Sequence, residues 1–286
     1  MSKAKLLMIQ GTSSGSGKTT LVTAFCRIFS NMGYRVAPFK AQNMSSSAYN
    51  IKSTSDQIAL AQAIQAIASR KNPDVRMNPV LLKPLGNYRS LIILGGKLYD
   101  EMHAKEYYEK FILQKGFPLT LKGLESLRKE NDLVIIEGAG SPAEVNILKY
   151  DIANMLLAHK VRAPVVITSD IERGGCFASI VGTMELLKPI HRRLVKGFII
   201  NKFRGDKSLL KPAMESVKKI TRRQFFGIIP RVDFCLPNED SLDGQASNRA
   251  VMSEGNWDRQ ISLIAKTVQK SIDIQNLSTN VIGLSK

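Results

Sequence analysis

Cysteine and histidine are scarce in this sequence, and neither type is spaced to form a site. Three residues of each kind are spread over the 286 residues. They are Cys26, Cys176, Cys235, His103, His159 and His191. No spacing among them is typical of a disulfide framework or a zinc site. We therefore expect reduced, structural cysteines and no zinc chemistry.

Long apolar runs are also absent. Leu133–Ile136 and Ala163–Ile167 are far shorter than the roughly 20 residues that cross a bilayer, and the N-terminus shows no signal-peptide hydrophobic region. Only 11 proline and 20 glycine residues accompany a hydrophobic content of 44%, which excludes a disordered or collagen-like chain. We expect a globular protein in the cytoplasm, without a membrane partner.

Acidic residues are outnumbered by basic ones. The sequence has 24 Asp and Glu residues and 41 Lys and Arg residues, which gives a formal net charge of +17. Such an excess is compatible with nucleic acid as a partner, but the basic residues are scattered apart from short runs such as 191–193 and 218–223, and no aromatic recognition module accompanies them. A solvated basic surface, or attraction of a small polyanionic substrate, is favoured over nucleic acid.

Apolar runs and helical patterns alternate along most of the chain. Strands are predicted at 5–10, 34–39, 80–82, 133–137, 163–169, 195–201 and 225–229, with a hairpin near 90–97. Helices are predicted at about 21–29, 56–69, 152–159, 177–187, 209–220 and 257–272, and the polar stretch 42–55 is predicted to be a loop. Repeated βα units of this kind predict an α/β fold with a mainly parallel sheet covered by helices on both faces.

The strongest local motif lies between the first predicted strand and helix. It comprises Gly11, Thr12, Ser13, Ser14, Gly15, Ser16, Gly17, Lys18, Thr19 and Thr20. Backbone N–H groups of such a loop surround a polyphosphate, while Lys18 reaches the β- and γ-phosphates and the Thr19 hydroxyl holds Mg²⁺. The usual spacing places a glycine where Thr12 stands, so this is a variant phosphate-binding loop (P-loop), and the alternative is a Gly/Ser-rich turn before a helix.

A metal-bound nucleotide also requires a carboxylate near the loop. Glu137 closes a buried strand just before the flexible run 138–140, which is the usual position of such a residue. Asp56 and Asp170 are candidates for a second metal carboxylate. Asp56 is equally suited to cap the predicted helix that it opens, and Asp170 ends a strand at the same sheet edge.

Six blocks of the sequence resemble the cobyric acid synthase family, within the dethiobiotin synthetase-like group of P-loop proteins. The blocks are 38–44 (PFKAQNM), 77–84 (MNPVLLKP), 137–146 (EGAGSPAEVN), 151–155 (DIANM), 173–179 (RGGCFAS) and 201–206 (NKFRGD). They occur in the family's order, and the resemblance covers roughly residues 5–242, the family's synthetase domain.

The resemblance implies ATP-dependent amidation of side-chain carboxylates of cobyrinic acid a,c-diamide in cobalamin biosynthesis. ATP phosphorylates a carboxylate and ammonia displaces the phosphate. By similarity the catalytic residues are Lys18 and Lys40, which neutralise the transferring phosphoryl group, and Glu137, which holds Mg²⁺ together with Thr19.

Further residues are assigned by the same similarity. Asn201, with Pro230 beside it, reads the adenine edge. Candidates for binding the corrinoid are Gln42, Asn43, Lys83 and Ser141. Relatives often pair as homodimers, so a homodimer is expected.

The sequence departs from the family at two places. No glutaminase domain with a nucleophilic cysteine follows the synthetase region, so ammonia is expected to be free or to come from a separate glutaminase subunit. The predicted division is an ATP-binding synthetase domain at 1–242, a polar linker at 243–256, and a C-terminal helix and tail at 257–286. Near Asp56 the family commonly has EIGRAQ, whereas residues 57–62 read QIALAQ, which weakens any metal or substrate role there.

Two other functions remain compatible with these residues. One is a related carboxylate-activating ligase with another substrate, which the blocks around Asn43, Pro79 and Arg173 disfavour. The other is a non-catalytic P-loop ATPase switch. Such proteins often carry an extra lysine early in the loop, where Ser13 and Ser14 stand here. If ATP turnover requires both a corrinoid acid and ammonia, the chain is an amidating enzyme of the cobyric acid synthase type and neither of these two alternatives.

Overall fold

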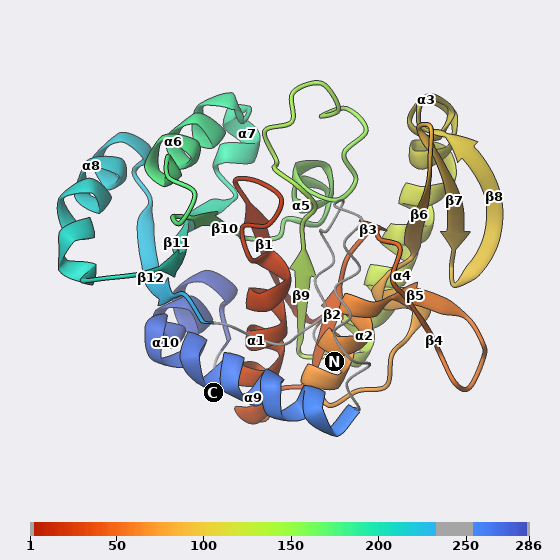
Figure 1. The fold of residues 1–286 in the computed structure, drawn as a ribbon, viewed down its shortest axis with the longest axis horizontal. Helices are drawn as coiled ribbons and strands as arrows, with labels where there is room; N and C mark the ends of the chain where they lie inside the picture. The colour runs from red at the N-terminus through yellow and green to blue at the C-terminus, as the bar shows by residue number, and fades with distance from the viewer. Residues whose placement is uncertain (1–2, 233–253, 285–286) are drawn as a thin grey trace.

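A six-stranded parallel sheet forms the centre of the molecule in the computed structural model, which describes residues 3–232 and 254–284 (Figure 1). The strand order is β12-β11-β10-β1-β9-β2. The strands are β1 (Lys5–Gly11), β2 (Val36–Phe39), β9 (Leu133–Glu137), β10 (Val165–Asp170), β11 (Val195–Phe203) and β12 (Gln224–Pro230). Because all six run in one direction, the segments that follow them gather at one carboxyl edge of the sheet.

Alternating side chains of these strands build two apolar layers. Leu6 and Met8 of β1 lie in one cluster, and Leu7 and Ile9 lie in the other, as a side-chain period of two requires. The first layer is covered by α4 (Phe117–Glu130), α5 (Met155–Val161), α6 (Cys176–Leu186) and α8 (Lys211–Thr221). The second is covered by α1 (Lys18–Asn31), α2 (Leu60–Ala68), α9 (Glu254–Ser271) and η4 (Leu277–Ile282). The predicted parallel sheet with helices on both faces is therefore confirmed.

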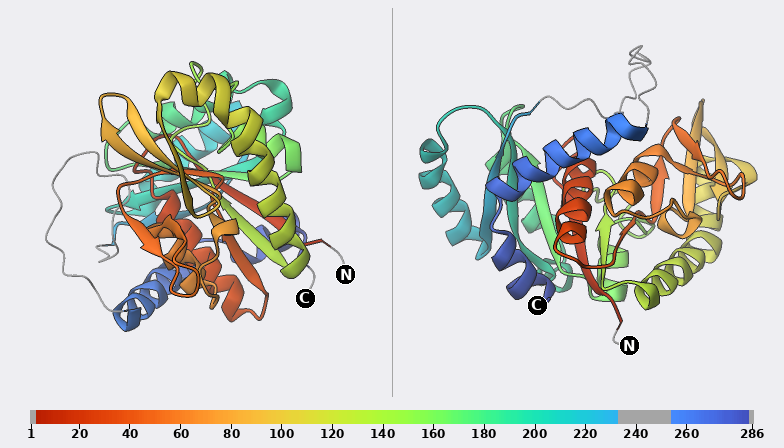
Figure 2. Two further views of the ribbon diagram at one scale, coloured as in Figure 1. Left: turned by 90° about the vertical axis from the view of Figure 1, so that its right-hand side faces the viewer. Right: turned by 90° about the horizontal axis from the view of Figure 1, so that it is seen from below.

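The C-terminal helix α9 lies along α1 on the second face of the sheet (Figure 2). Trp257, Ile261, Ile264 and Val268 are buried in the same cluster as Phe25 of α1. Most of the predicted linker, residues 243–253, and also Cys235 lie outside the described residues. No helix in the described part of the chain has the length and apolarity to cross a membrane.

A second sheet lies beyond β2 and was only partly predicted. Its order is β3-β6-β7-β8, with β3 (Gln42–Met44), β6 (Val80–Gly86), β7 (Arg89–Leu94) and β8 (Lys97–His103). The 90–97 hairpin forms as β7 and β8, but the segment after it was not assigned any structure from its sequence. It holds α3 (Ala104–Glu106), the π-helix η2 (Tyr107–Gly116) and α4. Short elements elsewhere are η1 (Val75–Met77), α7 (Pro189–Arg192), η3 (Lys207–Leu210) and α10 (Ile274–Asn276).

Two predictions for residues 42–69 are wrong. The stretch 42–55 contains β3 and β4 (Ala48–Asn50) instead of a loop, and Asp56 does not open a helix. Residues 57–59 form β5 (Gln57–Ala59), antiparallel to β4, and α2 begins only at Leu60. The reason is tertiary, since Ile58 is fully buried and the Gln57 N–H donates to the Gly96 carbonyl at 2.8 Å, so these contacts override the helical propensity of the Ala-rich run.

Candidate functional site

The loop 11–20 joins β1 to α1 at the carboxyl edge and is tightly folded. Gly15 and Gly17 have φ of 71° and 93°, a conformation that glycine adopts without strain. A Cβ on Gly11 would lie 2.0 Å from Ser16 Oγ, and one on Gly17 would lie 2.0 Å from Asn201 Nδ2. The glycine at 11, one position earlier than in the usual motif, is thus required by the close approach of Ser16.

The loop has the donors that a phosphate group needs. Ser16 Oγ is buried and has no hydrogen-bond partner among the described residues. A buried hydroxyl without a partner is costly unless a ligand satisfies it, and the N-terminus of α1 adds the positive end of a helix dipole. The residues of the loop therefore fit a bound polyphosphate.

Lys18 connects the loop to the segment after β9. Its ammonium donates to the Ser13 carbonyl at 3.0 Å and to the Gly140 carbonyl at 3.1 Å, and the residue is only 5% exposed. Arg173, which was not given a role from the sequence, reaches the same loop. One of its guanidinium nitrogens lies 3.7 Å from the position that a Cβ on Gly15 would take.

Glu137 is fully buried at the end of β9 and accepts hydrogen bonds from α1, α2 and the segment between β2 and β3. Its Oε1 accepts from Thr19 Oγ1 and from Lys40 Nζ, both at 2.8 Å, and its Oε2 accepts from Gln65 Nε2 at 2.5 Å. Ile9 and Glu137 are paired in register on β1 and β9, which brings the carboxylate beside the P-loop. The structure thus brings together Lys18, Thr19, Lys40 and Glu137, which are all of the residues predicted to be catalytic or metal-binding except Asp56.

A chain of buried amides leads from Glu137 to the second sheet. Gln65 Oε1 accepts from Gln62 Nε2 at 3.4 Å, and Gln62 Oε1 accepts from Asn43 Nδ2 at 3.0 Å. The carboxylate accepts only, so it fixes the direction in which each amide donates. Gln62 and Gln65 were not selected from the sequence, although their spacing of three on one helix face was a signal.

Asn201 and its neighbour Lys202 hold the P-loop from the side of β11. Asn201 Nδ2 donates to the Ser16 carbonyl at 3.0 Å, and Lys202 Nζ donates to the Gly15 carbonyl at 2.7 Å and to Asp170 Oδ2 at 2.8 Å. Lys202 has a φ of 60°, which is strained for a residue with a side chain. Pro230 pairs with Phe203 at the same edge. The sequence did not predict the role of Lys202, and it gave no signal of the positive φ.

Asp56 lies in a different part of the molecule from this cluster. Its backbone hydrogen bonds run to Ile51 and Thr54, and its side chain lies against Gly96 at the turn of the second sheet. Within the described residues no group of three or more His, Cys, Asp or Glu side chains is arranged to hold a metal ion. Asp170 stands at the predicted sheet edge, where its carboxylate pairs with Lys202.

The residues predicted to bind the substrate lie on β3, β6 and the segment after β9. Gln42 Oε1 accepts from the Tyr107 hydroxyl at 2.8 Å, and Lys83 Nζ donates to Gln57 Oε1 at 2.8 Å. Ser141 Oγ accepts from the Ala143 N–H at 3.2 Å. Gln42 and Asn43 follow Lys40 within three positions, so the second sheet begins directly beside the Glu137 cluster.

Asp151 and Asn154 fix the segment after β9. Asn154 Nδ2 donates to the Ala139 carbonyl at 2.5 Å and to Asp151 Oδ2 at 2.9 Å. Burial raises the pKa of the Asp151 carboxyl from 3.8 to about 6, against the hydrogen bonds from Asn154 and Ala153, which lower it, and the nearby Glu144 charge raises it further. Asn154 connects this carboxyl, whose pKa is about 6, to the Ala139 carbonyl, and the next residue, Gly140, accepts the hydrogen bond from Lys18.

The raised pKa of Asp151 predicts a pH-dependent stability. Between pH 4 and 6 the Asp151 carboxyl holds a proton in the folded chain that it has released in the unfolded chain. The contribution of this carboxyl to the unfolding free energy is therefore complete below pH 4 and is lost as the pH rises through 6. Asp151→Asn removes this contribution. The fall in unfolding free energy between pH 4 and 7 should then be smaller than in the unmodified protein by up to about 3 kcal/mol. Urea unfolding at both pH values measures this difference, and identical pH slopes for the two proteins would contradict the assignment.

Together, the parallel sheet, the P-loop and the buried carboxylate beside it define a P-loop nucleotide-binding domain. The chain belongs to the CobQ/CobB/MinD/ParA nucleotide binding domain family, whose sequence pattern it matches over residues 7–241. This confirms the fold class predicted from the sequence.

Within that family the chain is similar to proteins named cobyric acid synthase, as the six blocks indicated. It is 52% identical over 242 residues to the probable cobyric acid synthase of Thermococcus kodakarensis, covering 83% of this chain and 49% of that protein. It is 47% identical over 253 residues to the cobyric acid synthase of Desulfitobacterium hafniense, covering 88% of this chain and 49% of that protein. The chain therefore spans about half the length of the curated relatives it matches.

The solved structures that the chain matches include the signal recognition particle receptor FtsY from Elizabethkingia anophelis in complex with GDP. It has a TM-score of 0.49 and 14% identity, covering 82% of this chain and 59% of that chain. The Pyrococcus furiosus cell division ATPase MinD has a TM-score of 0.45 and 12% identity, covering 93% of this chain and 99% of that chain.

Proposed function

We propose that this chain carries out ATP-dependent amidation of side-chain carboxylates of cobyrinic acid a,c-diamide, the synthetase reaction of cobyric acid formation. The observation that carries the proposal is the cluster of Lys18, Thr19, Lys40 and Glu137 at the P-loop. The similarity of the chain to proteins named cobyric acid synthase indicates the class of substrate.

A carboxylate is a poor electrophile, and the reaction overcomes this in two steps. One carboxylate oxygen attacks the γ-phosphorus of ATP and ADP leaves, which gives an acyl phosphate. Ammonia then attacks the acyl carbon, and phosphate leaves with that oxygen while a proton is lost from nitrogen. No covalent bond to the protein is needed, so the task of the residues is positioning and charge neutralisation.

The two lysines fit the neutralising role. Lys18 is held by the Ser13 carbonyl of the P-loop and the Gly140 carbonyl after β9, and Lys40 is held by Glu137, so each ammonium is positioned before the substrates bind. Preorganised cations in a buried site stabilise phosphoryl-group charge without reorganisation at the moment of reaction. Because Lys40 leads directly into β3, it is the residue that links the phosphate side to the carboxylate side.

Oxygen ligands are what Mg²⁺ prefers, and Thr19 Oγ1 and a Glu137 oxygen lie 2.8 Å apart. These two residues would hold the ion, with phosphate oxygens and water as its other ligands, and the ion would supply positive charge at the phosphoryl group. Asn201 and Pro230, at the ends of β11 and β12, are proposed to border the adenine. Asn201 also supports the Ser16 carbonyl, so it can influence nucleotide binding in two ways.

Lys83 is the strongest of the substrate-side candidates. Its ammonium is half-buried, and its hydrogen-bond partner is the neutral amide of Gln57. An ammonium with a neutral partner keeps its full charge for a ligand. Gln42, Asn43 and Ser141 are proposed to add polar contacts to the corrinoid, whose free carboxylates suit a chain with a net charge of +17.

The direct test is incubation of the purified chain with ATP, Mg²⁺, ammonium and cobyrinic acid a,c-diamide. We expect mass spectrometry to detect conversion of carboxyl to carboxamide, with ADP formed in equal amount. ATP turnover that is indifferent to both the corrinoid and ammonium would contradict the proposal.

Glutamine in place of ammonium should give no product with these 286 residues. The glutaminase domain of the family uses a cysteine nucleophile, and of the two cysteines among the described residues burial raises the pKa of the Cys26 thiol to about 12 and also raises that of Cys176. Turnover with glutamine alone, in a preparation free of ammonium, would show that the nitrogen source is assigned wrongly.

A further inference from the structure

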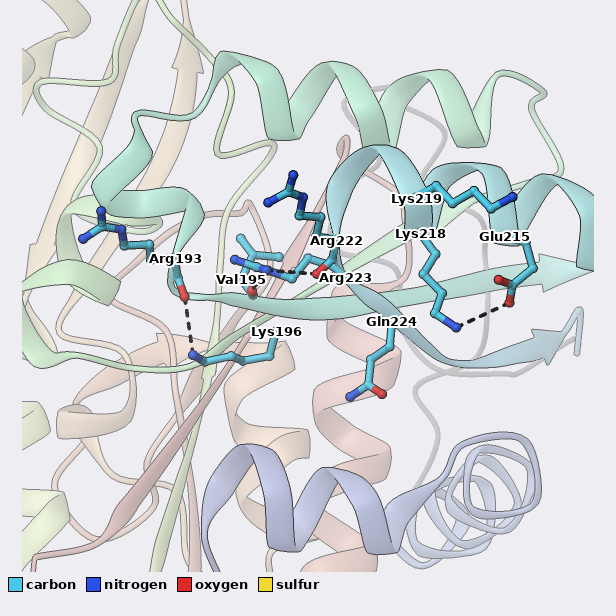
Figure 3. A pocket seen from close by; sticks show the side chains of 9 residues that line it. All are labelled: Arg193, Val195, Lys196, Glu215, Lys218, Lys219, Arg222, Arg223 and Gln224. Atoms are coloured by element: carbon cyan, nitrogen blue, oxygen red, sulfur yellow. Dashed lines mark hydrogen bonds and ion pairs between the residues drawn. The ribbon is translucent and has the colours of Figure 1, made fainter.

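A basic cavity of about 680 Å³ lies at the amino edge of the central sheet, opposite to the P-loop (Figure 3). It is formed where β11 and β12 begin and where α8 ends. The P-loop follows the carboxyl end of β1, and all six strands are parallel, so the two sites are on opposite edges. The cavity is lined by Arg193, Val195, Lys196, Glu215, Lys218, Lys219, Arg222, Arg223 and Gln224.

Six of these residues are basic and one is acidic, and the six cations differ in how they are held. Arg223 has a structural role, because its guanidinium donates to the carbonyls of Val195 at 2.6 Å, Arg222 at 3.0 Å and Arg192 at 3.4 Å. Lys196 donates to the Arg193 carbonyl at 3.4 Å, and Lys218 lies 3.6 Å from Glu215. The side chains of Arg193, Lys219 and Arg222 have no hydrogen bond or ion pair within residues 3–232 and 254–284.

Some exposed arginines elsewhere on the described surface are paired with carboxylates, whereas Arg70, Arg162, Arg173 and Arg259 have no carboxylate partner within residues 3–232 and 254–284. Arg35 pairs with Asp132 at 2.7 Å, Arg89 pairs with Glu101, and Arg192, just outside the cavity, pairs with Glu185 at 3.2 Å. What distinguishes this cavity is that six basic residues and only one acidic residue line a single concave site, so the cations lie close together there. Like charges held close together repel, so an anion bound among them stabilises the fold.

We propose that this cavity binds a ligand with two or more linked phosphate groups, at a site separate from the P-loop. Guanidinium groups match phosphate oxygens in bidentate geometry, and ammonium groups add charge around them. One phosphate would neutralise only part of the excess, and the cavity volume lies within the range of about 300–1,000 Å³ of small-ligand sites. The ligand is either inorganic polyphosphate or the phosphate chain of a nucleotide.

The test compares two triple variants with equal loss of charge. Arg193→Ser/Lys219→Ser/Arg222→Ser removes the unpaired cations of the cavity. Lys97→Ser/Lys105→Ser/Lys110→Ser removes exposed lysines of β8, α3 and η2. Calorimetric titration with inorganic tripolyphosphate should show a class of sites in the unmodified protein that weakens at least about tenfold in the cavity variant and less than about twofold in the control. Equal weakening in both variants, or in neither, would overturn the proposal.

Two further ligands identify the source of the phosphate chain. If ATP at this site weakens together with tripolyphosphate, the proposal holds and nucleotides are included; if only tripolyphosphate weakens, it holds for the inorganic chain. A short single-stranded DNA that binds more tightly than tripolyphosphate, and that also depends on the three cavity residues, would overturn the proposal in favour of a nucleic-acid surface.

Arg222→Gly separates binding from folding. Arg222 caps α8 in the left-handed conformation with a φ of 54°, where glycine is unstrained. We expect this variant to have a higher melting temperature than the unmodified protein and yet to bind tripolyphosphate about threefold more weakly. Unchanged affinity in this variant and in the cavity variant would show that the cavity cations do not contact phosphate.

Discussion

Lys18→Ala is expected to lower the rate of amide formation by about 10³-fold or more. The Lys18 ammonium is held between the Ser13 and Gly140 carbonyls, at 3.0 Å and 3.1 Å, so it is fixed at the place where phosphate charge develops. Alanine removes one of the buried cations that neutralise that charge. The measurement is steady-state formation of carboxamide with ATP, ammonium and the diamide, together with the affinity for ATP.

The matched control is Lys97→Ala, which removes the same charge from an exposed position on β8. We expect less than a twofold change in rate for this variant, since exposed single charges contribute little. A Lys18→Ala protein that forms amide at the normal rate would contradict the role of the P-loop in this reaction, and with it the proposed function.

Glu137→Gln is expected to affect both activity and stability. The carboxylate is fully buried and holds Lys40, whose side chain is only 5% exposed. Removing one partner of a buried ion pair leaves the other charge uncompensated, at a cost of about 3–5 kcal/mol. Activity should fall by about 10²-fold or more, because Thr19 and Lys40 lose the group that orients them. Urea unfolding and the amidation assay measure the two effects.

The double variant Lys40→Met/Glu137→Gln distinguishes the two effects. Because neither charge remains, it should be more stable than Glu137→Gln alone, while it should stay inactive. If the double variant is no more stable than the single variant, the ion pair between Lys40 and Glu137 is not what makes the single substitution costly. If the double variant is active, neither residue has the proposed role.

The P-loop and the carboxylate after β9 were predictable because their signals are local. A Gly/Ser-rich run between a strand and a helix requires only neighbouring residues to form, and Glu137 follows directly from the end of an apolar run. The alternation of strands and helices likewise predicted the parallel sheet. The match of residues 7–241 to the family agrees with the six blocks that carried the resemblance.

The residues around those groups were not predictable in the same way. Gln65 reaches Glu137 across 72 positions, and Lys202 reaches Gly15 across 187, so no local pattern connects the partners. Asp56 shows the opposite error. Its position before an Ala-rich run predicted either a helix cap or a metal carboxylate, whereas the pairing of β4 with β5 places it against Gly96.

By itself, the sequence determined the six strands of the central sheet, the phosphate-binding loop and the similarity to cobyric acid synthases, since short-range spacing and residue type encode all of these. Only the tertiary structure decided which side chains share a site. These are the three donors to Glu137, the hydrogen bonds from Asn201 and Lys202 to the P-loop, and the unpaired cations at the opposite edge of the sheet. Packing of distant strands sets these distances, and burial then determines which charges keep a partner and which are left for a ligand.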